Sequence, residues 1–122
     1  MSHIVQIATE VRDEQAAIAA CRRLGLAPPT RGAARLFESE AVGLLVALPG
    51  WLYPVVVDTN SGAIRYDNYG GRWGEPAELG RFLQAYALEK ATIEARRRGH
   101  SVVEQALPDG SIKLTIRVGG VS

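Results

Sequence analysis

Residues 76–98 read PAELGRFLQAYALEKATIEARRR and are the longest periodic run in the chain. Apolar side chains recur there at offsets of three, four and seven residues, which is the spacing of one face of an α-helix. Pro76 suits the first turn of such a helix, and Gly99 can adopt the left-handed conformation that ends it. At about 1.5 Å per residue the helix would span roughly 34 Å, enough to cross a small sheet. We therefore predict a helix whose buried face carries Leu79, Phe82, Leu83, Tyr86 and Ile93.

Lys90 interrupts this apolar face, one helical turn after Tyr86. A lysine that faces a sheet must extend its ammonium to the edge of the sheet or find an acidic partner. We expect that partner to be Asp67 first, and Asp58 or the Tyr86 hydroxyl second. Tyr86 and Lys90 also have the spacing of the catalytic pair of short-chain dehydrogenases, but the chain lacks the length and the glycine fingerprint of those enzymes.

A second, shorter helix is predicted over residues 16–24, with Asp13 as its N-cap. Ala17, Cys21 and Leu24 would face inward on it. A lone cysteine among small apolar residues is expected to be a buried, inert thiol rather than a catalytic one. Because one cysteine cannot form an intramolecular disulfide, the chain fits a reducing compartment.

Strands are predicted where apolar residues alternate with polar ones or form short unbroken runs between turn residues. Residues 31–35 are predicted to be a small basic loop. Antiparallel strands with two helices on one face of the sheet make an α+β two-layer sandwich, and 122 residues are the size of one domain, over residues 1–122. The predicted strands are residues 4–11, 42–48, 53–58, 63–68, 101–107 and 111–118.

The overall composition excludes several classes of protein. The hydrophobic fraction of 47% and the charged fraction of 22% are ordinary for a globular domain. A net charge of +1 gives no strong attraction to nucleic acid or to an anionic membrane. The sequence contains no run approaching about 18 apolar residues and no signal-peptide pattern at its N-terminus. We expect a soluble, cytoplasmic protein without a membrane partner.

Few residues carry a recognisable chemistry. The glycine-rich residues 69–74 precede the long helix, but their spacing matches neither the P-loop nor the dinucleotide fingerprint. Arg72 and Trp73 are therefore expected to set a tight entry from strand to helix. Residues 96–98 are three arginines, which the dipole at the end of a helix explains, so nucleic-acid binding is not favoured. Two histidines and one cysteine are too few for a zinc site, and we expect no catalytic residue, metal or cofactor.

Several segments resemble a known family. The opening Met1-Ser2-His3, residues 86–90, and residues 99–104 with 109–114 are similar to the conserved plastid open reading frame thirty-five family of cyanobacteria, other bacteria and red-algal plastids. The resemblance covers essentially the whole chain and is weakest over residues 28–54. It implies a soluble single domain without assigned catalysis, in an accessory role, with an AAA-type ATPase or a ferredoxin-like protein as partner. The family's aromatic-and-acid segment is matched by Asp67, Tyr69 and Trp73.

Two hypotheses of function follow. The first is a non-enzymatic interaction module that docks on a larger protein complex through its sheet edge or an exposed face. The second is a small-ligand-binding or enzymatic domain with a polar pocket around Tyr86, Lys90 and Asp67; Trp73 and Arg72 are the other two candidate binding residues. Nucleic-acid binding through the three arginines is a weaker third. The sequence leaves open the oligomeric state, a homo-oligomer included, and whether Lys90 is structural or functional.

Overall fold

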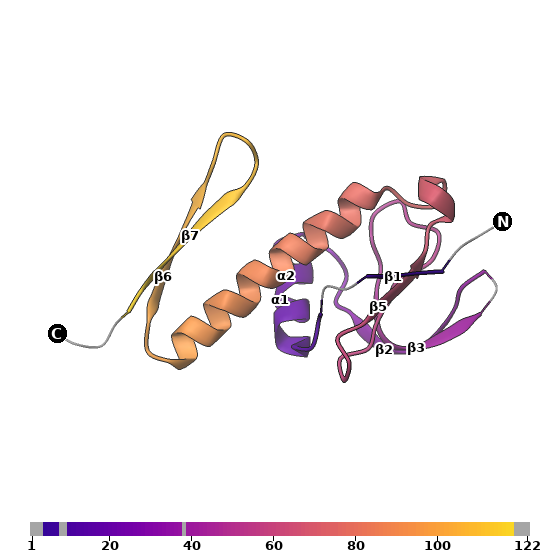
Figure 1. Cartoon of the computed structure of the whole chain (residues 1–122), viewed down its shortest axis with the longest axis horizontal. Helices are drawn as coiled ribbons and strands as arrows, with labels where there is room; N and C mark the ends of the chain where they lie inside the picture. Colours follow the sequence, from indigo (N-terminus) through magenta and orange to yellow (C-terminus); the bar gives the residue numbers. More distant parts are fainter. Residues whose placement is uncertain (1–3, 8–9, 38, 119–122) are drawn as a thin grey trace.

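The computed structural model describes residues 4–7, 10–37 and 39–118. They form two α-helices and two antiparallel sheets (Figure 1), which confirms the predicted α+β class. The helices are α1 (Glu14–Arg23) and α2 (Pro76–Arg97), and a short 3₁₀ turn, η1 (Tyr69–Gly71), precedes α2. The strands are β1 (Ile4–Ile7), β2 (Thr30–Arg35), β3 (Glu40–Val46), β4 (Val55–Val57), β5 (Ile64–Asp67), β6 (Ser101–Ala106) and β7 (Ile112–Arg117).

The larger sheet has the strand order β1-β5-β4-β3-β2, and every neighbouring pair is antiparallel. Gly43 in β3 permits a close approach to β4, because a Cβ atom there would lie 2.4 Å from the carbonyl oxygen of Val57. The prediction of a basic loop over residues 31–35 is wrong, since these residues belong to β2 and pair with β3. An edge strand tolerates arginines because half of its side chains face solvent.

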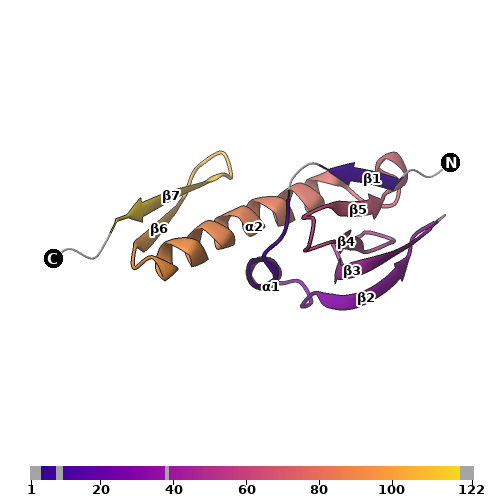
Figure 2. The ribbon, with the colours of Figure 1, turned by 60° about the horizontal axis from the view of Figure 1, so that its bottom comes forward.

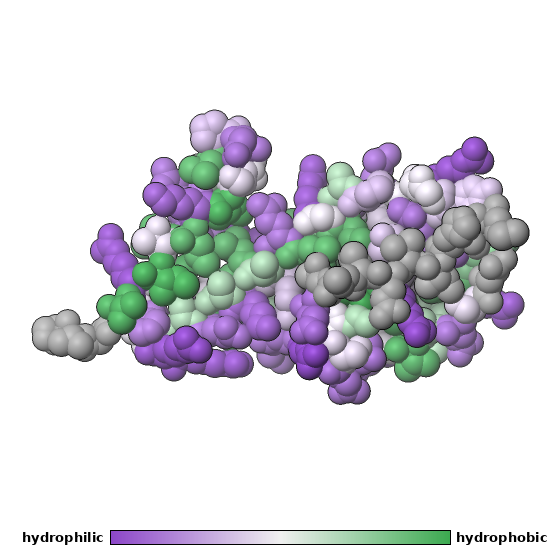
Figure 3. Space-filling view, viewed as in Figure 1, coloured by the Kyte–Doolittle hydropathy of each residue, from purple (hydrophilic) through white to green (hydrophobic). Residues whose placement is uncertain are grey.

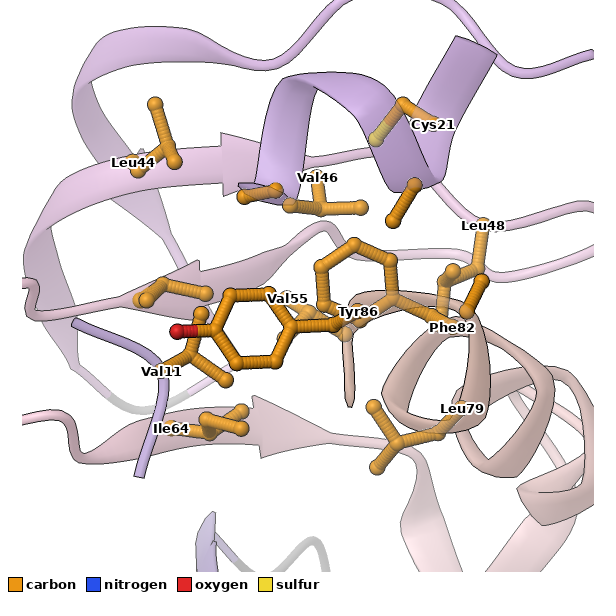
Figure 4. Close-up of a cluster of buried hydrophobic side chains, with 14 of the residues drawn as sticks. Val11, Cys21, Leu44, Val46, Leu48, Val55, Ile64, Leu79, Phe82 and Tyr86 are labelled. Atoms are coloured by element: carbon orange, nitrogen blue, oxygen red, sulfur yellow. The ribbon is translucent and has the colours of Figure 1, made fainter. Parts of the chain in front are cut away.

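The core lies between one face of this sheet and the two helices (Figure 4). Phe82 and Tyr86 of α2 project between the sheet and α1, where Val46 and Val55 meet them. α1 contributes small buried side chains, among them Ala17 and Cys21, so the two helices pack closely. Both helices therefore cover the same face of the sheet, as the two-layer prediction requires. The predicted burial of Cys21 is also confirmed.

α2 changes its buried face along its length. Leu79, Phe82 and Tyr86 belong to the core on the sheet, but within α2 no fully buried residue beyond Tyr86 does. Leu88 and Thr92 are buried instead, and Leu88 lies two residues after Tyr86, which is about 200° around the helix. Figures 1 and 2 show the reason: the second half of α2 extends past the sheet and carries the β6–β7 hairpin alongside it.

The hairpin β6–β7 is a separate two-stranded sheet rather than an extension of the larger one. Its register pairs Val102 with Ile116 and Glu104 with Leu114, so these four side chains lie on one face. The turn between its strands closes where the Leu107 N–H donates to the Ser111 carbonyl at 2.9 Å, with Gly110 at a φ of 89°. The predicted Pro108-Asp109-Gly110 turn is therefore confirmed.

Candidate functional site

Tyr86 has a structural role in this fold. Its hydroxyl oxygen accepts hydrogen bonds from the backbone N–H groups of Arg12 at 3.1 Å and Asp13 at 3.0 Å. The Asp13 carboxylate in turn accepts from the Ala16 N–H at 3.1 Å, which confirms Asp13 as the N-cap of α1. Tyr86 thus ties α2 to the start of α1, and its hydroxyl already has two donors. A hydroxyl oxygen has two lone pairs, so both are used here.

Lys90 does not form the predicted ion pair. It is half-buried and takes part in none of the ion pairs found among the described residues. Asp58, its second expected partner, instead accepts a hydrogen bond from the Asn60 N–H at 3.0 Å, and the hydroxyl of Ser61 helps to lower the pKa of this carboxyl. Ile93, one turn further along α2, still packs partly buried against the core, so the helical pattern is correct for this face, but none of the described acidic side chains lies within ion-pair distance of Lys90.

Asp67 lies on the far face of the sheet from Tyr86. Side chains alternate along β5, and Ile64 and Tyr66 pack on the helix side, so Asp67 points to the other side. The carboxylate is completely buried, and both of its oxygens lack a hydrogen-bond partner among the described residues. The polar pocket expected around Tyr86, Lys90 and Asp67 is therefore not assembled in this structure.

Trp73 is the centre of a cluster of aromatic rings at the entry to α2. Its ring stacks on Tyr69 at 4.7 Å between centroids and meets Phe37 at 5.3 Å and Tyr53 at 5.7 Å. The Arg72 guanidinium carbon lies 5.4 Å above the Tyr69 ring. Tyr69 has a φ of 49°, which is uncommon for a residue with a Cβ atom. The two predicted residues Arg72 and Trp73 thus shape the strand-to-helix entry, as expected.

The end of the molecule opposite this cluster presents a second candidate surface, which we call the arm. The arm comprises residues 88–118, that is, the second half of α2 and the β6–β7 hairpin. Three apolar side chains on the hairpin are strongly exposed: Val103 at 49%, Ile116 at 42% and Val118 at 82%. Figure 3 shows hydrophobic residues continuing from the hairpin onto α2. The register puts Val103 on one face of the hairpin and Ile116 on the other, so each face exposes an apolar side chain.

A groove runs between α2 and the hairpin turn. Two adjoining hollows of about 270 and 190 Å³ share Gln84 of α2 and Ile112 of β7 in their walls. The first is otherwise lined by Ala87 and Leu88, and the second includes Arg81. The groove therefore combines an apolar floor with a cationic end.

An ion-pair network fixes the arm to α1. One nitrogen of Arg23 lies 2.8 Å from a carboxylate oxygen of Glu89 in α2 and 2.8 Å from one of Glu104 in β6. The hydrogen bonds that Arg23 donates to Glu104, and then to Glu89, raise the pKa of Arg23, and the bond that Glu104 accepts lowers the pKa of Glu104. The sequence analysis did not predict this network. Glu89 is 66 positions and Glu104 is 81 positions from Arg23 in the chain, so no local sequence pattern connects them.

Several classes of site find no support among the described residues. No group of three histidine, cysteine or acidic side chains could hold a metal ion in the described part of the chain. None of the helices described has the length and apolar content needed to cross a membrane. No family model, curated protein or solved structure matches the chain. The aromatic cluster and the arm are therefore judged on their geometry alone.

Proposed function

We propose that this protein is a non-enzymatic accessory module that docks on a larger protein complex through the arm. The observation that supports this proposal most is the set of exposed apolar side chains, Val103, Ile116 and Val118, on an element that leaves the main body. A two-stranded sheet is at best marginally stable alone in water. The hairpin has α2 on one side only, so a further protein surface would complete its packing.

Burial of the exposed apolar side chains of the arm would favour binding of a partner. Fully covering one valine or isoleucine side chain contributes about 1.5–3 kcal/mol. The exposed side chains of the arm retain a large part of that contribution for a partner, because they are 42–82% accessible. Most single mutations on exposed surfaces change stability little, so such residues can be kept for binding at small cost to the fold.

The charge of the arm indicates the chemistry of the partner. Residues 88–118 carry six basic and four acidic side chains, a balance of +2, while residues 1–87 carry eight basic and nine acidic ones, a balance of −1. A complementary partner surface is acidic around an apolar centre. An AAA-type ATPase or a ferredoxin-like protein, the two classes implied by the family resemblance, are the partners to test first.

The experiment is affinity capture with matched variants. The tagged chain, its Val103→Ser/Val118→Ser variant and a Val42→Ser/Leu52→Ser variant are incubated with nuclease-treated extract of the native organism. Val42 and Leu52 are 73% and 60% exposed but belong to the larger sheet and the loop after it. We expect one stable partner to be retained by the native chain and the control, and lost by the arm variant. Equal loss by the control variant, or the same partner retained by all three chains, would contradict docking through the arm.

A further inference from the structure

β7 has a free edge. Within the part of the chain that is described, it pairs only with β6. The bond from the Leu107 N–H to the Ser111 carbonyl sets the phase of the ladder, in which hydrogen-bonded and non-hydrogen-bonded pairs alternate. Lys113, Thr115 and Arg117 therefore hydrogen-bond to β6. The N–H and C=O groups of the residues between them point away from β6, toward the free edge.

Successive side chains of β7 point to opposite faces of the hairpin. Ile112, Leu114 and Ile116 lie on the face that also carries Glu104, which reaches Arg23, so this face turns toward the helices. Ile112 also lines the groove along α2. Lys113, Thr115 and Arg117 lie on the opposite, exposed face. One face of the edge is thus apolar and the other basic.

We propose that the partner docks by adding an extended segment to the free edge of β7, and that this segment alternates apolar and acidic residues. This inference rests on the proposed function and specifies how the arm binds. Backbone hydrogen bonds to the outward N–H and C=O groups supply affinity, as in other cases of strand addition. The apolar side chains of the segment continue the face of Ile112 and Leu114, and its acidic side chains lie beside Lys113 and Arg117.

The charges disfavour a second copy of this chain in the register that pairs two β7 strands about Thr115. If two copies paired their β7 strands antiparallel about Thr115, Lys113 of one copy would lie opposite Arg117 of the other. Like charges directly opposite each other in a sheet are destabilising. A segment with acidic residues at those positions replaces two repulsive pairs by attractive ones.

A model peptide tests the proposal directly. The probe is a capped peptide of alternating valine and glutamate, long enough to match β7, and binding is followed by the amide NMR shifts of the full chain. We expect shifts concentrated on residues 112–117. A peptide of the same sequence with N-methyl groups on alternate amides should bind at least tenfold more weakly, because it lacks the backbone donors. The variant Lys113→Glu/Arg117→Glu should lose affinity for the valine–glutamate peptide. The same variant should bind a valine–lysine peptide with the affinity that the native chain has for the acidic one.

The controls separate the possible outcomes. Arg35→Glu/Arg65→Glu makes the same change of net charge on the larger sheet and should leave the affinity within about twofold, because both arginines are exposed and distant from β7 in the chain. Equal binding of the N-methylated peptide would overturn strand addition in favour of simple charge attraction. If no peptide binds although the arm variant still loses its captured partner, strand addition is wrong and the docking function stands. If neither result is obtained, both proposals fail.

Discussion

The fully buried side chains of the two halves of α2 lie on opposite sides of the helix, while Ile93 of the second half is partly buried against the main core. The first half places Phe82 and Tyr86 into a core bounded by the sheet and α1, where cover is complete. The second half buries Leu88 and Ala95 under a hairpin that leaves much apolar surface exposed. A single helix therefore packs into a closed core at one end and supports a partly exposed hairpin at the other. The difference indicates where the stability of the fold resides, and it is the basis of the proposed docking role of the arm.

Removing one large side chain from each half of α2 tests most directly whether the two halves contribute differently to stability. Phe82→Ala should lower the free energy of unfolding by about 3–5 kcal/mol, because it empties the centre of the core. Leu88→Ala should cost about 2 kcal/mol or less, and the loss should be local to the hairpin. Chemical denaturation gives the global value, and amide exchange shows which strands lose protection. Equal loss of protection in β4 and β6 for Leu88→Ala would show that the two halves unfold as one unit.

The junction between the halves is Tyr86, and its hydroxyl can be removed alone. Tyr86→Phe leaves the N–H groups of Arg12 and Asp13 without their acceptor, so we expect a loss of about 1–3 kcal/mol. Tyr66→Phe is the matched control, because Tyr66 is half-buried in the same core and its hydroxyl forms no hydrogen bond among the described residues. Thermal unfolding of both variants measures the difference. Similar melting temperatures for the two would contradict the anchoring role of Tyr86.

Asp67 is a buried group of the sheet whose charge is expected to lower stability. A buried carboxylate without donors is unfavourable, so Asp67→Asn should raise the free energy of unfolding, by on the order of 1 kcal/mol. Asp58→Asn makes the same chemical change at a carboxylate that accepts backbone hydrogen bonds, and it should lower stability instead. Denaturant titrations of both variants are read for the sign of the change. A destabilised Asp67→Asn would mean that a donor satisfies the carboxylate in solution.

The sequence predicted the individual elements of the molecule, the β6–β7 hairpin included, better than it predicted how they pack together. Period-two patterns and the Asp13 cap act locally, so most strands, both helices and the faces of Cys21 and Phe82 could be found from them. Helical periodicity says which side chains share a face, but it does not say which acidic side chains lie beside that face. Lys90 was assigned a buried partner for that reason. β2 was not predicted because its two arginines are typical of an exposed loop, although the segment pairs with β3 at the edge of the sheet.

The same limit applies to the candidate site. Arg72 and Trp73 could be placed at the helix entry because they are adjacent to it in sequence. The arm could not be recognised as a candidate docking surface, since its geometry depends on Ile112 lying beside Leu88 and on Arg23 pairing with Glu104, and only the folded chain brings these residues together. Asp67 and Tyr86 were expected in one pocket, yet strand alternation and the position of α2 place them on opposite faces of the sheet.

The smallest expected effect concerns the attachment of the arm and depends on pH. The bond from Arg23 lowers the pKa of Glu104 below its ordinary value of 4.5 in the folded protein. A depressed carboxyl pKa contributes stability that is fully present above the unfolded value and is lost as the pH falls through the folded one. The hairpin should therefore loosen as the pH falls below this ordinary value, and more than β3 does, because the bond between Arg23 and Glu104 joins the hairpin to α1. Because Glu104 is more than a third exposed, solvent screening keeps the contribution small.

Amide exchange of β6 and β7, compared with that of β3 and β4 at each pH, measures this loosening. Glu104→Gln should already show a weakened hairpin at neutral pH, and its hairpin protection should change less on acidification, because the titrating partner of Arg23 in β6 is gone. Glu40→Gln is the matched control, since Glu40 forms no ion pair among the described residues, and it should behave like the native chain. If the native hairpin keeps its protection at low pH, the contact between Arg23 and Glu104 does not hold the arm, and the apolar face of Ile112 and Leu114 alone fixes its position on α2.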